Sequence, residues 1–165
     1  MHSPYLRWVK LRGSFGLDYY LELQYNQNAN MSAKILVVDD DPDILDAVTM
    51  ILESQGYQVV TAENGLQGLA KIEAEEPDLM ILDLLMPKMD GFALFKELQD
   101  PRWLKYKDMP ILILSSVREE ASRRRYELET GVELEMADYI EKPFSPDVLL
   151  KRVEEIISRK TNSKT

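Results

Sequence analysis

Acidic residues follow two apolar runs of this sequence, and a lysine follows a third strand-like run. Asp39 and Asp40 come directly after the run 35–38, Asp83 ends the run 81–83, and Lys142 stands just before Pro143. Two carboxylates about 4 Å apart repel by about 1 kcal/mol in water and by about 4 kcal/mol at an effective dielectric of about 20. If these acids lie together, they need a cation, and Lys142 is a fixed one.

The types of the candidate residues favour magnesium and phosphoryl transfer. The chain has no cysteine and a single histidine at position 2, which excludes thiolate and histidine-rich metal sites. Carboxylate and carbonyl oxygens suit Mg²⁺, which also binds phosphate. A cation, an ammonium and the hydroxyl of Ser115 around Asp83 are the groups that an in-line phosphoryl transfer needs. We predict an aspartyl phosphate on Asp83, with Mg²⁺ held by Asp39 or Asp40, Asp83 and the carbonyl of Leu85.

Strand and helix patterns alternate from residue 34 onward and place these groups. Strands are predicted over 34–38, 58–62, 79–82, 111–114 and 137–140. Helices are predicted after the capping residues Asp41, Asn64, Asp90 and Ser145 and over 118–130. Five such units with apolar strands predict an α/β fold, a doubly wound parallel sheet with helices on both faces. The working site of such a sheet lies at the carboxyl ends of its strands.

Composition limits the class of protein. The chain has 165 residues, enough for about one domain, and 45% of them are hydrophobic. The net charge of −9 argues against general nucleic-acid binding and against docking on anionic lipid. No apolar run reaches the roughly 18 residues of a membrane-spanning helix, and the N-terminus lacks the apolar core of a signal peptide. We therefore expect a cytoplasmic protein without direct nucleic-acid or membrane contacts.

Four segments in order, ILVVDDDPDI, LMILDLLMPKMDG, PILILSS and DYIEKPF, resemble the receiver domain of two-component response regulators over residues 33–159. The resemblance implies a flavodoxin-like fold of five strand–helix units with strand order 2-1-3-4-5. It implies a sensor histidine kinase that donates phosphate to Asp83, and it assigns Asp39 and Asp40 to the metal. Ser115 is then the phosphate-sensing hydroxyl, and Lys142 contacts a phosphate oxygen.

The same resemblance makes two further assignments near the last strand. Tyr139 is the aromatic switch residue that rotates on phosphorylation, although a half-buried strand aromatic would give the same pattern. The bond between Lys142 and Pro143 is expected to be cis, an isomer that only bonds preceding proline adopt at low cost. Leu85 and Val117 stand where the family often places polar groups that position a hydrolytic water. Two apolar side chains there predict slow loss of phosphate.

The sequence divides into residues 1–30, 31–160 and 161–165. The first segment is nearly neutral and is interpreted as a leader or an appended segment, with a weak strand pattern over 17–25. The second is the receiver domain, and the third is a polar tail. We expect a stand-alone receiver that is no enzyme beyond slow self-dephosphorylation and that signals by contact with an unknown protein. A dimer through the face formed by 118–130, 137–140 and the last helix is a further hypothesis.

Other functions remain open at this stage. The receiver could be a phosphorelay intermediate that passes phosphate to a histidine carrier, or a receiver fold that never takes phosphate. A phosphatase of the aspartyl-phosphate kind would want a second aspartate at the position of Leu85. A flavodoxin-like electron carrier would need a hydroxyl- and glycine-rich loop where this chain has the acids 39–41. The cluster of arginines 123–125 is either a solvated helix face or a surface for an acidic partner.

Overall fold

Five parallel strands form the sheet at the centre of the protein. The computed structural model describes residues 9–10, 19–20, 33–116, 124, 127–128, 131 and 138–162. The strands are β3 (Lys34–Val38), β4 (Gln58–Ala62), β5 (Leu79–Asp83), β6 (Ile111–Ser115) and β7 (Asp138–Glu141). Their order across the sheet is β4-β3-β5-β6-β7, which is 2-1-3-4-5 when these five are counted along the chain. The predicted α/β, flavodoxin-like fold is confirmed.

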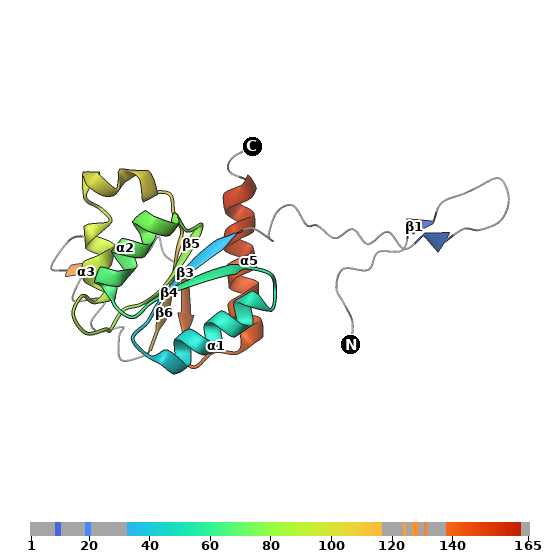
Figure 1. Ribbon diagram of the computed structural model, residues 1–165, viewed down its shortest axis with the longest axis horizontal. Helices are drawn as coiled ribbons and strands as arrows, with labels where there is room; N and C mark the ends of the chain where they lie inside the picture. The colour runs from blue at the N-terminus through green and yellow to red at the C-terminus, as the bar shows by residue number, and fades with distance from the viewer. Residues whose placement is uncertain are drawn as a thin grey trace.

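Helices cover both faces of this sheet (Figure 1). The structure describes α1 (Pro42–Glu53), α2 (Gly65–Glu75), α3 (Gly91–Glu97), the 3-10 helix η1 (Pro101–Tyr106) and α5 (Pro146–Asn162). One face packs against α1 and α5, and the other packs against α2 and α3. Among the described helices, none has both the length and the hydropathy that crossing a bilayer requires.

Alternation along the strands divides the core into two layers. On β3, Ile35 and Val37 join the cluster that contains the buried residues of α1 and α5. Leu36 and Val38 join the cluster on the opposite face, which contains residues of α2 and α3. All four side chains are fully buried, and burying a side chain of this size contributes about 1.5–3 kcal/mol. The continuous apolar strands of the sequence therefore reflect burial on both faces.

Capping side chains begin the helices that follow the strands. The side chains of Asp41, Asn64 and Asp90 each accept a hydrogen bond from a backbone N–H two or three residues later, at 2.9, 3.1 and 2.7 Å. These bonds satisfy N–H groups that have no partner within the helix. The three predicted caps are confirmed, and they start each helix immediately beyond the carboxyl edge of the sheet.

Several boundaries differ from the predicted ones. β5 continues through Asp83 and β7 spans Asp138–Glu141, because sheet pairing extends to the functional residues themselves. α5 continues to Asn162, two residues into the segment expected to be a polar tail. Within residues 1–30, β1 (Val9–Lys10) pairs antiparallel with β2 (Tyr19–Tyr20). Most of the predicted helix over 118–130 and the segment 132–137 lie outside the described residues.

Replacing Thr49 with valine is expected to stabilise the protein. Thr49 lies in α1, and within the described part of the chain its hydroxyl oxygen is the buried side-chain polar atom without a hydrogen-bond partner. Valine has the same shape and removes that polar group, so urea unfolding should show a gain of about 1 kcal/mol. The control is Thr61→Val, because Thr61 is an exposed residue of β4, and this change should alter stability by less than about 0.5 kcal/mol. A loss of stability in Thr49→Val would contradict this expectation.

Candidate functional site

The predicted site residues lie at the carboxyl edge of the sheet, where β3, β5 and β7 end. Val38 of β3 is paired with Leu82 of β5 in parallel register, so the next residues, Asp39 and Asp83, are neighbours. The N–H of Asp39 donates to the carbonyl of Ala62 on the other side at 3.1 Å. The end of β3 is therefore fixed from both adjacent strands.

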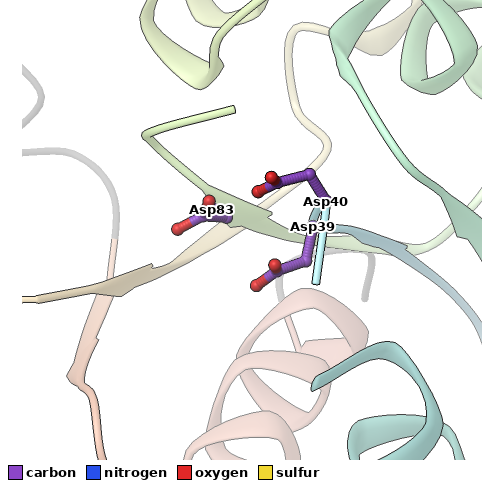
Figure 2. Close-up of side chains that lie close together, drawn as sticks. All are labelled: Asp39, Asp40 and Asp83. Atoms are coloured by element: carbon purple, nitrogen blue, oxygen red, sulfur yellow. The ribbon is translucent and has the colours of Figure 1, made fainter. Parts of the chain in front are cut away.

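Three carboxylates form a cluster at this edge. One oxygen from each of Asp39, Asp40 and Asp83 lies within 4.8 Å of the other two. Figure 2 shows the three carboxyl groups extending to the same side of the strand ends. Asp39 and Asp83 are buried, with 1% and 4% of their surface exposed, whereas Asp40 is exposed. The cluster is therefore buried at Asp39 and Asp83 and accessible to solvent at Asp40.

Lys142 bridges the two buried acids. Its Nζ donates to Oδ2 of Asp39 at 2.8 Å and to Oδ1 of Asp83 at 3.1 Å. Burial of the ammonium lowers the pKa of Lys142, but the hydrogen bonds and charges of Asp39 and Asp83 outweigh that effect and raise its pKa above the ordinary value of a lysine. The lysine is therefore protonated at neutral pH. The peptide bond between Lys142 and Pro143 is cis.

Asp39 is also held in place by the start of α1. Its Oδ1 accepts a hydrogen bond from the N–H of Asp41 at 2.9 Å, while its Oδ2 accepts from Lys142. Both oxygens of this carboxylate are engaged, which fixes its orientation. Asp41 in turn caps α1 through its own side chain. Local capping geometry thus positions one acid of the cluster.

The donor set fits a hard divalent cation. One ammonium stands among three carboxylates, so the cluster keeps a net negative charge when all three are ionised. Mg²⁺ prefers oxygen ligands, binds one or two protein carboxylates and retains several waters. Such ligands are available here from two buried carboxylates, those of Asp39 and Asp83, and from the solvent-exposed carboxylate of Asp40. These residues can hold Mg²⁺, which would there neutralise charge on a bound phosphoryl group.

For three further predicted site residues, the structure gives a position in the fold but does not establish a role. Ser115 is the last residue of β6 and pairs with Glu141, so its backbone lies at the same edge. Tyr139 is half-buried in β7 and packs against the cluster of Leu84, Phe92, Phe95 and Ile113. The side chain of Leu85 is 46% exposed. The roles of the Ser115 hydroxyl, the Tyr139 ring and the Leu85 carbonyl remain predictions.

A glycine that the sequence marked only as the beginning of a helix contacts the site directly. A Cβ on Gly91 would lie 2.3 Å from the carbonyl oxygen of Asp83 and 2.8 Å from Cα of Leu84. The Gly91 N–H donates to the Leu84 carbonyl at 3.0 Å. The backbone beside Asp83 is therefore packed against a position that excludes any side chain. The sequence carries one signal for this contact, a glycine that begins a helix soon after an acid at a strand end. The predictions made from the sequence did not use that signal.

Some predictions fall partly on residues that the structure does not describe. Val117, Arg123 and Arg125 lie outside the described residues. Arg124 is helical and exposed. The arginine cluster therefore stays an untested hypothesis, as does the dimer face that includes 118–130.

The sequence of this chain is similar to those of known response regulators. The profile of the response regulator receiver domain matches residues 35–154. The alkaline phosphatase synthesis transcriptional regulatory protein PhoP of Bacillus subtilis is 40% identical over 129 residues, which cover 78% of this chain and 50% of PhoP. The response regulator MprA of Mycobacterium bovis is 35% identical over 129 residues, covering 78% of this chain and 52% of MprA. The chain spans about half the length of the curated relatives it matches.

Solved structures of receiver domains match a similar share of the chain. The chemotaxis protein CheY4 of Vibrio cholerae is 33% identical, with a TM-score of 0.64 covering 76% of this chain and 98% of CheY4. The receiver domain of the Francisella response regulator 1452 is 30% identical, with a TM-score of 0.62 covering 78% of this chain and 98% of that domain. The profile match includes the acidic cluster and Lys142.

Proposed function

This chain belongs to the response regulator receiver family, and from that premise we propose that it is a phosphorylation-activated switch of a two-component system. A receiver domain implies a histidine kinase as its phosphate donor, and Asp83 is the proposed acceptor. The observation that carries the proposal is Lys142, which lies 2.8 Å from one buried carboxylate and 3.1 Å from the other. An acidic cluster of this kind is typical of the Mg²⁺ site of receivers, and we assign Mg²⁺ to it.

The proposed step transfers a phosphoryl group from a phosphohistidine to Asp83. A carboxylate oxygen of Asp83 forms a bond to phosphorus while the bond from phosphorus to the imidazole nitrogen breaks. The nitrogen keeps the electron pair and takes up a proton, so the donor leaves as neutral histidine. Lys142 is protonated and already directed at Asp83, so it can donate to a phosphate oxygen without reorganisation. Ser115 is proposed to supply a hydroxyl, and the carbonyl of Leu85 a further metal ligand.

Phosphorylation is proposed to repack the edge of the sheet. A phosphoryl group brings about −1.5 to −2 charges and three strong acceptors. Ser115 would turn toward it, and Tyr139 would follow because it packs against the cluster that contains Leu84, the residue after Asp83. Moving such a two-state surface from 1:99 to 99:1 takes about 5.5 kcal/mol of differential binding. A few charge-assisted hydrogen bonds could supply part or all of this energy.

We propose that the output of the receiver is a protein contact made in the cytoplasm. The net charge of −9 supports a protein partner over direct nucleic-acid contact. The names of PhoP and other relatives favour a second output, control of transcription by a longer protein. A phosphorelay intermediate would instead pass the label on, so transfer from the phosphorylated chain to a histidine carrier separates these roles.

The test is the intact mass of the protein after incubation with acetyl phosphate. One added phosphate is expected when Mg²⁺ is present, and little or none when a chelator removes the metal. Absence of any phosphorylated species with Mg²⁺ would overturn the proposed function. In that case the remaining hypothesis is a receiver fold that does not take phosphate.

The lifetime of the phosphorylated protein is expected to be long, lasting minutes or more. Leu85 lies two residues after Asp83 and presents an apolar side chain that cannot position a hydrolytic water. Replacing it with asparagine should shorten the half-life several-fold, measured as loss of phosphate from purified protein. Leu104→Asn is the control, because Leu104 is also an exposed leucine but lies in η1. Loss of phosphate from the wild type within seconds would contradict this prediction.

A further inference from the structure

Two glycines that leave no room for a side chain hold the far end of the loop that follows Asp83. This loop, residues 84–90, carries the Leu85 carbonyl and ends at Asp90, which caps α3. At its far end Gly91 packs against the Asp83 backbone. Near that end, the N–H of Gly65 in α2 donates to the carbonyl of Met89 at 2.8 Å. The loop is therefore attached to a helix that carries none of the proposed site residues.

The contact between Gly65 and Met89 is too close for any residue larger than glycine. A Cβ on Gly65 would lie 2.7 Å from Met89 Cγ and 2.8 Å from the Met89 carbonyl oxygen. The side-chain atom can move at low cost, but the carbonyl oxygen can move only if the loop backbone moves. Because the same carbonyl accepts the Gly65 N–H, displacing it also breaks that bond.

Gly65 is itself held rigidly. It is the first residue of α2, and the preceding Asn64 is buried and accepts a hydrogen bond from the Gln67 N–H at 3.1 Å. The first N–H groups of a helix have no partner within the helix, and here one of them is used to hold the loop. Within the loop, Leu84 and Met86 are buried whereas Leu85 between them is exposed. The backbone of Leu85 thus sits between two anchored residues.

We propose that Gly65 is a positioning residue for the metal site, acting through its contact with Met89 on the loop that carries Leu85. The inference rests on the proposed function, since it concerns the binding of Mg²⁺. Mg²⁺ demands near-octahedral geometry with short ligand distances. A backbone carbonyl cannot adjust by changing a side-chain rotamer, so its place depends on how the loop is held. The hydrogen bond from Gly65 of α2 to the Met89 carbonyl holds this loop.

The first test measures Mg²⁺ affinity by isothermal titration calorimetry. Gly65→Ala should weaken Mg²⁺ binding by about tenfold or more, the size seen when groups that orient a metal ligand are removed. Phosphate uptake from acetyl phosphate should then need more Mg²⁺ while its maximal rate is retained. Wild-type affinity in Gly65→Ala would overturn the inference. Failure of the wild type to bind Mg²⁺ would overturn the proposed function itself.

A second variant in α2 separates positioning of the loop from general destabilisation. Gly68 is in the same helix, but a Cβ there would meet the side chains of Leu94 and Val38, at 2.8 and 3.4 Å, rather than the loop. Gly68→Ala should alter thermal stability and leave Mg²⁺ affinity within about twofold. Equal weakening in Gly68→Ala would overturn the inference.

A measurement on the wild type decides the question even if Gly65→Ala does not fold. Coupling between two sites is reciprocal, so Mg²⁺ at the acidic cluster should strengthen the contact of Gly65 with Met89. Hydrogen exchange of the Gly65 amide should slow when Mg²⁺ is added. The Gly68 amide, which donates to the Asn64 carbonyl at 2.9 Å, should slow less. Equal slowing of both amides would overturn the inference.

Discussion

Replacing Asp83 with asparagine is expected to abolish phosphorylation by acetyl phosphate, the largest functional effect of any single change in this protein. The amide lacks the anionic oxygen that attacks phosphorus, although its size and shape match the carboxyl group. The Lys142 ammonium lies 3.1 Å from that carboxyl group, so the variant removes one of the two carboxylates that this positive charge contacts. Intact mass after incubation with Mg²⁺ and acetyl phosphate should show one phosphate on the wild type and none on Asp83→Asn.

The matched control is Asp41→Asn, an acid-to-amide change close to the site. Asp41 is exposed and caps α1 by accepting the Asp43 N–H at 2.9 Å, a role that asparagine also fills. Asp41→Asn should therefore accept phosphate like the wild type. Phosphate on Asp83→Asn would mean that another carboxylate is the acceptor. Peptide mapping would then have to distinguish Asp39 from Asp40.

The position of the acidic cluster could be predicted from sequence because it depends on topology. Asp39 and Asp83 each end an apolar strand, and parallel strands bring their carboxyl ends to one edge. No side-chain geometry is needed to conclude that they are neighbours. Lys142 follows the same rule from β7, so the charge balance of the site was predictable as well.

The contact between the loop and helix α2 could not be predicted in the same way. The hydrogen bond from Gly65 at the start of α2 to Met89 joins a helix to a loop whose separation in space depends on packing, and no periodic pattern in the sequence marks it. The sequence indicated Gly91 as the beginning of a helix but not its contact with Asp83, because a close backbone approach has no signature beyond the glycine itself. Tyr139 was ambiguous for a related reason, since a half-buried aromatic fits both packing and switching.

Replacing Lys142 with methionine is expected to cause the largest loss of stability among the site variants. Asp39 and Asp83 would stay buried without the ammonium that both of them contact. Removing one partner of a buried ion pair typically costs about 3–5 kcal/mol, so urea unfolding at neutral pH should show a loss of about 3 kcal/mol. Mg²⁺ that binds only the folded protein should restore part of this loss.

The control for this variant is a lysine in an exposed ion pair. Lys105 pairs with Glu76, and their side chains are 64% and 59% exposed. Lys105→Met should lower the free energy of unfolding much less than Lys142→Met does, because exposed ion pairs contribute little to stability. Equal losses in the two variants would contradict the importance of burial at the site. A neutral effect of Lys142→Met would mean that the acids do not need this cation in the folded protein.

The pH dependence of the Lys142 contribution follows from the direction of its pKa shift. The folded protein raises the pKa of Lys142 above the ordinary value of a lysine, because the contacts with Asp39 and Asp83 outweigh burial. A raised pKa of a cationic group stabilises the fold fully below the unfolded value and loses that stabilisation as pH rises through the folded value. The difference in the free energy of unfolding between wild type and Lys142→Met should therefore be constant from neutral pH up to the ordinary pKa of lysine and shrink as the pH rises beyond it through the raised pKa of the folded protein. A difference that persists unchanged at higher pH would show that packing of the lysine chain, rather than its charge, stabilises the site.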